Sequence, residues 1–170
     1  MTDLKKLLLN AWKTVKVDYT NGLINSERCL QASLYRALRI EIDNIPELKV
    51  FVEPDWKGSY GIPDVVVCES GTEGHEPIVA ALLELKFVPH FYPEYKNDMK
   101  KLRDAVHTEL QQLISLVPSS GEFDNIKYTV SDKTLPVFVV VGKEDAAAVD
   151  QPANNFSGLK EKLFVLSAKT

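Results

Sequence analysis

The chain has 170 residues, a formal net charge of −4 and a hydrophobic fraction of 45%. This fraction is typical of globular proteins rather than disordered chains, and the length favours one domain, 1–170, with a single sizeable core. The negative charge argues against a protein that coats nucleic acid through bulk attraction.

Hydrophobic periodicity and turn residues predict a chain that alternates helices and strands. The predicted helices cover 3–16 (within an N-terminal extension, 1–20), 27–42 and 99–117, and the predicted strands cover 48–53, 64–68, 78–88 and 135–142. A fifth strand at 162–168 and a short helix at 156–161 are also predicted, whereas 119–134 is predicted to be a loop. Strands that are apolar on both faces indicate a sheet covered on both sides. The expected fold class is therefore α/β, with a mixed central sheet of four to five strands flanked by helices.

Two features of the sequence bear on where the protein works. No apolar run approaches the roughly 20 residues that a membrane-spanning helix needs, so no membrane partner is expected. Cys29 and Cys68 stand alone, without a CxxC motif or metal-ligand spacing. A reduced, cytoplasmic setting is therefore expected.

Two of the predicted strands carry ionisable residues that a buried strand does not favour. Glu84 and Lys86 point to the same face of strand 78–88, because side chains alternate along a strand, and Asp64 opens strand 64–68. If these strands pair as a hairpin, the three side chains converge at one rim of the sheet. The alternative is ordinary turn chemistry at Asp64 and a solvated Glu84–Lys86 pair worth under ~1 kcal/mol.

Such a cluster suits metal-assisted hydrolysis of a phosphodiester. Mg²⁺ is usually held by one or two carboxylates, with waters and substrate phosphate as its other ligands. Asp64 and Glu84 supply the pair, and the backbone carbonyl of Leu85 lies between Glu84 and Lys86. A lysine beside the ion can hold a water nucleophile and offset phosphate charge. The expected cofactor is therefore Mg²⁺, with Mn²⁺ as a substitute.

The Pro-Asp pair at Asp64, followed by Glu84-Leu85-Lys86 on a strand, resembles the signature of the PD-(D/E)xK nuclease superfamily. That superfamily has the restriction-endonuclease-like fold, whose α-β-β-β-α-β core matches the order predicted from about residue 26 to 142. The resemblance implies metal ligands at Asp64 and Glu84 and a catalytic lysine at Lys86. It also implies a glutamate on the preceding helix that reaches the metal, for which Glu27 is the candidate. Glu27 is equally well explained as a first-turn glutamate favoured by the helix dipole.

The helix after the third strand resembles the "D-x-x-K-L" opening found in many predicted proteins of this fold, with Asp98, Lys101 and Leu102 at the matching positions. Several residues near the predicted rim could contact nucleic acid, because basic and amide side chains can bind phosphates and aromatic side chains can stack on bases. They are Gln31, Trp56, Lys57, Tyr60, Lys96, Lys100, Lys101 and Arg103. Each group also has an alternative role. Gln31 could support Glu27, the residues of the 56–60 loop could pack against the fold, and the basic residues of the helix could form a solvated face.

The sequence thus predicts a metal-dependent nuclease, with DNA favoured over RNA as substrate. The alternative is a catalytically inactive nuclease-fold module that binds nucleic acid or protein. A homodimer would supply the two sites needed to cut a duplex. The apolar face of the N-terminal helix could form that interface or pack internally.

Overall fold

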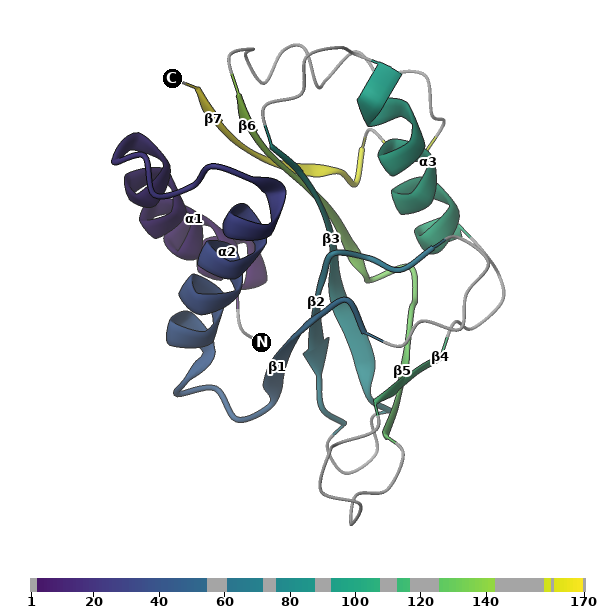
Figure 1. Cartoon of the computed structure of the whole chain (residues 1–170). Helices are drawn as coiled ribbons and strands as arrows, with labels where there is room; N and C mark the ends of the chain where they lie inside the picture. Colours follow the sequence, from purple (N-terminus) through teal and green to yellow (C-terminus); the bar gives the residue numbers. More distant parts are fainter. Residues whose placement is uncertain are drawn as a thin grey trace.

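The computed structural model describes residues 3–54, 61–71, 76–87, 93–107, 113–116, 126–142, 158–159 and 161–169. The helices are α1 (Leu4–Thr20), α2 (Glu27–Ile42) and α3 (Pro93–His107). The strands are β1 (Leu48–Val52), β2 (Val65–Glu69), β3 (Ile78–Phe87), β4 (Leu113–Leu116), β5 (Ile126–Thr129), β6 (Leu135–Gly142) and β7 (Phe164–Lys169). The predicted α/β fold class is confirmed, with α1 and α2 on one face of a mixed sheet and α3 on the other (Figure 1).

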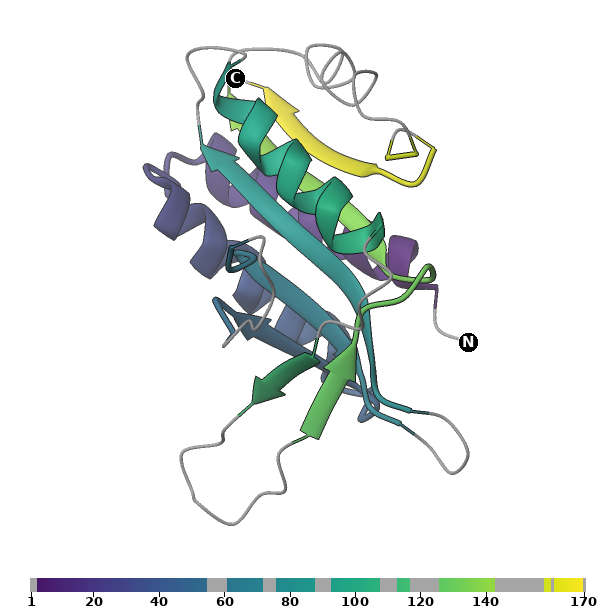
Figure 2. The same ribbon diagram turned by 90° about the vertical axis from the view of Figure 1, so that its right-hand side faces the viewer.

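Strand β3 lies at the centre of the sheet. β1, β2 and β3 pair in antiparallel order, and β3, β6 and β7 pair in parallel order. The β4–β5 hairpin joins near the start of β3, where Ile78 pairs with Thr129, and projects from one end of the sheet (Figure 2). The predicted order α-β-β-β-α-β is present as α2, β1, β2, β3, α3 and β6.

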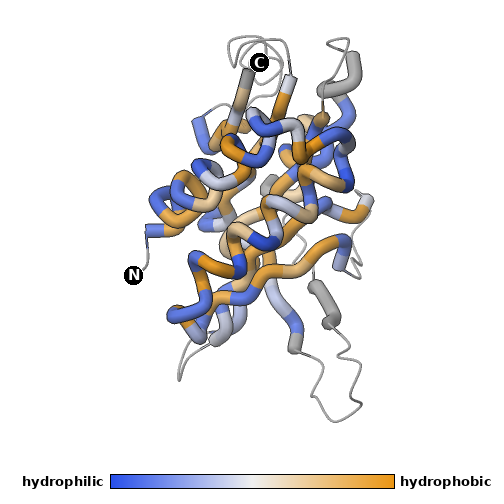
Figure 3. The backbone as a smooth tube through the Cα atoms, turned by 60° about the vertical axis from the view of Figure 1, so that its left-hand side comes forward, coloured by the Kyte–Doolittle hydropathy of each residue, from blue (hydrophilic) through white to orange (hydrophobic). Residues whose placement is uncertain are grey.

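The central strands consist mostly of apolar residues (Figure 3). Their buried side chains form one cluster on each face of the sheet. On β3, Leu83 and Leu85 pack with the cluster beneath α1 and α2, whereas Leu82 packs with the cluster beneath α3. Strand alternation therefore places Glu84 on the α3 face. The burial of β3 on both faces gives the site a rigid floor.

The N-terminal helix belongs to this packing. One stripe of α1 is buried, and the indole Nε1 of Trp12 donates a hydrogen bond of 3.1 Å to the carbonyl oxygen of Ser167 in β7. Of the two alternatives for this apolar face, internal packing is the one present. Among the described helices, none combines the length and apolar character needed to cross a lipid bilayer.

Three predictions of local structure were wrong. The sheet has seven described strands instead of four to five, because β5 lies within the predicted loop 119–134 and β4 within the predicted helix 99–117. That helix begins earlier than predicted and ends at His107. In the segment 156–161, where a short helix was predicted, residues 156, 157 and 160 lie outside the described residues, and 158, 159 and 161 form a turn. The strand predicted at 162–168 is present as β7.

Candidate active site

The register of the β2–β3 hairpin sets the position of the first two acidic residues. Val65 pairs with Leu83, so Asp64, one residue before β2, comes opposite Glu84. The backbone N–H of Leu85 donates a hydrogen bond of 2.7 Å to Oδ2 of Asp64. The hairpin predicted from the sequence is therefore present, and it joins Asp64 to the Glu84-Leu85 segment directly.

The backbone of Asp64 is fixed from two other elements. Its carbonyl oxygen accepts hydrogen bonds from Nε2 of Gln31 at 3.0 Å and from the N–H of Glu53 at 3.1 Å. Gln31 comes from α2, and Glu53 follows β1, so the carboxylate projects from a well-anchored point. Burial raises the pKa of Asp64, and the hydrogen bond from Leu85 opposes that increase.

Glu84 is the most buried acidic side chain of the site. Only 3% of the residue is exposed, and its Oε2 lies 3.2 Å from Nζ of Lys101 in α3. Burial, followed by the neighbouring Asp64, raises the pKa of Glu84 from 4.5 to about 8. The ammonium of Lys101 lowers that pKa but does not outweigh burial. The positive charge around Glu84 is therefore too small to offset the effect of burial on its pKa.

Lys86 has different partners from those of Glu84. Its Nζ lies 3.2 Å from Oδ2 of Asp98 and 3.7 Å from Oε2 of Glu27. Asp98 also lies 3.6 Å from Nζ of Lys101. Burial alone would lower the pKa of Lys86, but Asp98 and Glu27 outweigh it and raise that pKa. We call the alternating series Glu84, Lys101, Asp98, Lys86 and Glu27 the charge chain.

Asp98 is the residue whose role the sequence did not reveal. It is 5% exposed and contacts both lysines of the charge chain. The "D-x-x-K-L" pattern placed Asp98 and Lys101 one helical turn apart, which was the available signal. Only the packing of α3 on β3 determines that this side of the helix faces the site.

The other predicted residues separate into three groups. Glu27 contacts Lys86, and among the described residues no three Asp, Glu, His or Cys side chains converge on a single metal position. Lys100 points outward on α3, and Arg103 donates to its neighbour Asp104 at 2.6 Å. Trp56, Lys57, Tyr60 and the side chain of Lys96 lie outside the described residues.

A small recess opens beside Glu84 and Lys101. It is lined by Gly61, Pro63, Leu82, Glu84, Lys101, Leu102 and Ala105. Gly61 adopts a φ of +87°, and a Cβ built there would lie 3.6 Å from Cε of Lys101. Gly61, three residues before Asp64, thus lies near the outer carbons of the Lys101 side chain.

The oxygen atoms of the site are of the type that hard divalent cations such as Mg²⁺ and Mn²⁺ prefer as ligands. Asp64 and Glu84 offer carboxylate oxygens. The N–H and C=O of a strand residue point to the same side, so the carbonyl of Leu85, like its N–H, is expected on the side of β3 that faces β2. Asp64 and the charge chain together comprise four carboxyl and two ammonium groups, a formal excess of two negative charges when every group is ionised.

No family model and no curated protein matches the chain. Among solved structures, the cAAA-bound form of NucC from P. aeruginosa ATCC27853 is similar at 15% sequence identity and a TM-score of 0.45. The similarity covers 98% of this chain and 74% of that one. A likeness this loose says nothing about the chemistry of the site.

Proposed function

We propose that the chain is a metal-dependent nuclease that hydrolyses phosphodiester bonds, with DNA favoured over RNA. One observation carries the proposal: Asp64 and buried Glu84 lie opposite each other on a rigid hairpin, in a cluster with a formal excess of two negative charges. Buried carboxylates are costly unless they are paired or bind a cation. One divalent ion would neutralise that excess.

In this proposal Asp64, Glu84 and the Leu85 carbonyl hold the ion. A bound divalent ion would supply stabilisation of the charge on the phosphate. The ammonium of Lys86 orients the attacking water and contributes positive charge, while Asp98 and Glu27 hold that ammonium in place. In this proposal Glu27 helps to position the Lys86 ammonium and does not bind the ion directly.

Strand cleavage of DNA and RNA tests the proposal. The purified chain should cut plasmid DNA with Mg²⁺ or Mn²⁺ and should be inactive in EDTA. Lys86→Ala should lower the cleavage rate by about a hundredfold or more, because a positioned proton-transfer or water-holding group contributes that much. Equal rates for the wild type and Lys86→Ala would refute the mechanism.

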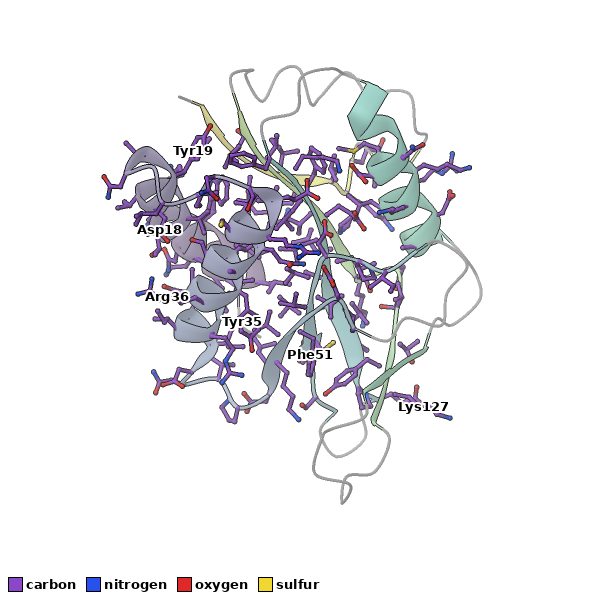
Figure 4. All side chains as sticks on the ribbon, in the orientation of Figure 1. Asp18, Tyr19, Tyr35, Arg36, Phe51 and Lys127 are labelled. Atoms are coloured by element: carbon purple, nitrogen blue, oxygen red, sulfur yellow. The ribbon has the colours of Figure 1, made fainter. Side chains whose placement is uncertain are left out.

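Lys127→Ala is the matched control for this experiment. Lys127 is exposed on β5, at the end of the sheet away from α3 (Figure 4). The substitution removes the same charge from the chain as Lys86→Ala but leaves the charge chain intact. Cleavage by this variant should match cleavage by the wild type.

A second candidate is an inactive module with the same fold. Lys101 occupies the position beside Glu84, which is the arrangement expected if no ion binds there. Calorimetric titration with Mn²⁺ separates the candidates: binding that Asp64→Asn abolishes supports the nuclease, and its absence supports the module.

A further inference from the structure

The ammonium of Lys101 lies where the proposed ion needs room. Its Nζ is 3.2 Å from Oε2 of Glu84 and forms an ion pair and a hydrogen bond with that oxygen. A divalent cation that shares Glu84 would lie within a few ångströms of this ammonium, and the two positive charges would repel each other. The lysine and the ion therefore compete for one carboxylate.

Lys101 has a second partner within reach. Oδ1 of Asp98 lies 3.6 Å from the same ammonium, one helical turn earlier on α3. The Lys101 side chain is 38% exposed, so its end can turn without disturbing the core. Asp98 can thus keep the lysine paired after it leaves Glu84.

The remaining contacts restrict this movement to the end of the side chain. Leu102 is buried next to Lys101 in α3, so the helix fixes the base of the lysine side chain, and a Cβ at Gly61 would lie 3.6 Å from Cε, near the end of the stem. Both Glu84 and Lys101 line the recess described above. Movement of the ammonium alone would enlarge it.

We propose that Lys101 is a resident counterion of Glu84, which a divalent cation displaces toward Asp98 when it binds. The inference rests on the proposed function, because it concerns the same ion. It makes Lys101 a positioning residue that sets ion affinity. In the ion-free protein Lys101 partly neutralises Glu84, and in the loaded protein it is paired with Asp98.

Mn²⁺ affinity, measured by calorimetry without nucleic acid, tests the inference. Lys101→Met keeps much of the aliphatic stem but removes the ammonium, so Mn²⁺ should bind at least about threefold more tightly than to the wild type. Lys101→Arg keeps the charge and should bind Mn²⁺ like the wild type. Lys100→Met is the control, since it removes one positive charge from the exposed side of the same helix.

Thermal unfolding with and without Mn²⁺ gives a second measurement that does not depend on activity. The Mn²⁺-induced rise in Tm should be larger for Lys101→Met than for Lys100→Met, because tighter binding stabilises the folded state more. If Lys101→Met does not fold, Lys101→Gln, which retains a polar end, takes its place. The expected order of affinity is the same.

The outcomes separate the inference from the proposed function. Equal or weaker Mn²⁺ binding by Lys101→Met overturns the inference. If Glu84→Gln still abolishes Mn²⁺ binding in that case, the proposed metal site stands. Mn²⁺ binding by none of the variants overturns both. The inference is supported most directly if Lys101→Met binds Mn²⁺ tightly and the wild type does not.

Discussion

Replacing Glu84 by Gln should alter how the stability of the fold depends on pH. The substitution keeps the size and polarity of the side chain and removes its ability to ionise. In the folded wild type, burial followed by the neighbouring Asp64 raises the pKa of Glu84 from 4.5 to about 8. The unfolded chain retains the ordinary value, so the two states release this proton in different pH ranges.

The sign of the effect follows from proton binding. Below about pH 4.5 both states hold the proton, and Glu84 adds no pH dependence. Between that pH and about 8 the unfolded chain has lost the proton while the folded chain keeps it, so rising pH favours unfolding. Stability from this group is therefore lost as pH rises and is fully lost above the folded pKa.

The interval between 4.5 and about 8 sets an upper limit of roughly 5 kcal/mol, at about 1.36 kcal/mol per pH unit. Structural relaxation around an ionised Glu84 reduces this value. From about pH 5 to about pH 9, we expect the free energy of unfolding of Glu84→Gln, relative to wild type, to increase by about 2 to 4 kcal/mol.

Urea unfolding in buffers that contain EDTA measures this difference. The other titratable groups are present in both chains, so the comparison reports Glu84 together with its coupling to Asp64 and Lys101. Glu69→Gln, at the exposed end of β2, is the matched control and should follow the wild type at every pH. A difference between Glu84→Gln and wild type that stays constant across the range would refute the reasoning. Mn²⁺ at the alkaline end should stabilise the wild type and reduce the difference.

Three further substitutions test the surroundings of the site. Asp98→Asn removes the shared partner of both lysines and should cost about 1 to 3 kcal/mol of stability in urea unfolding. When it is combined with Lys101→Met, the loss of stability should be smaller than the sum of the two single losses by about 0.5 kcal/mol or more. Strict additivity would show that the residues of the charge chain do not interact. Gln31→Ala removes a hydrogen bond to the Asp64 carbonyl and should cost about 0.5 to 1.5 kcal/mol, with unchanged stability contradicting the anchoring role. Gly61→Ala places a side chain at a positive φ and should lower Tm, with a cost of about 1 kcal/mol; an unchanged Tm would contradict the strained backbone.

Strand alternation and hairpin pairing were enough to predict where Asp64, Glu84 and Lys86 lie relative to one another. Apolar runs on both sides of a short polar turn predicted β2 and β3, and an antiparallel pair brings the start of one strand to the end of the other. The position of Asp64 opposite Glu84 follows from that pairing. Lys86 lies on the same face as Glu84 because side chains two residues apart on a strand point to the same side.

The inserted hairpin was missed for a local reason. Leu113 continues the helical spacing of the preceding apolar residues, so β4 was assigned to the helix. β5, the four-residue IKYT segment, is short and follows polar and glycine residues that are typical of loops. Its pairing with β3 is a tertiary contact, which no local pattern encodes.

The partners of the two lysines were missed for a different reason. Glu84 and Lys86 lie on one face of one strand, and the sequence alone suggests that they pair with each other. In the structure α3 crosses this face and inserts Asp98 and Lys101, so each strand residue finds its partner on the helix. Residues two apart on a strand are separated by nearly 7 Å along its axis, which favours partners from another element.

The energetics of Glu84 favour a role beyond stability. Buried ion pairs are often matched or surpassed in stability by apolar side chains of similar volume, and Glu84 lies between apolar neighbours on a strand that is otherwise suited to such packing. The single ammonium of Lys101 leaves its pKa raised, so the charge is compensated only in part. A second positive charge at the same place would lower that pKa and recover the lost stability. The feature that weakens the ion-free fold at neutral and alkaline pH is therefore the feature that would bind a divalent cation.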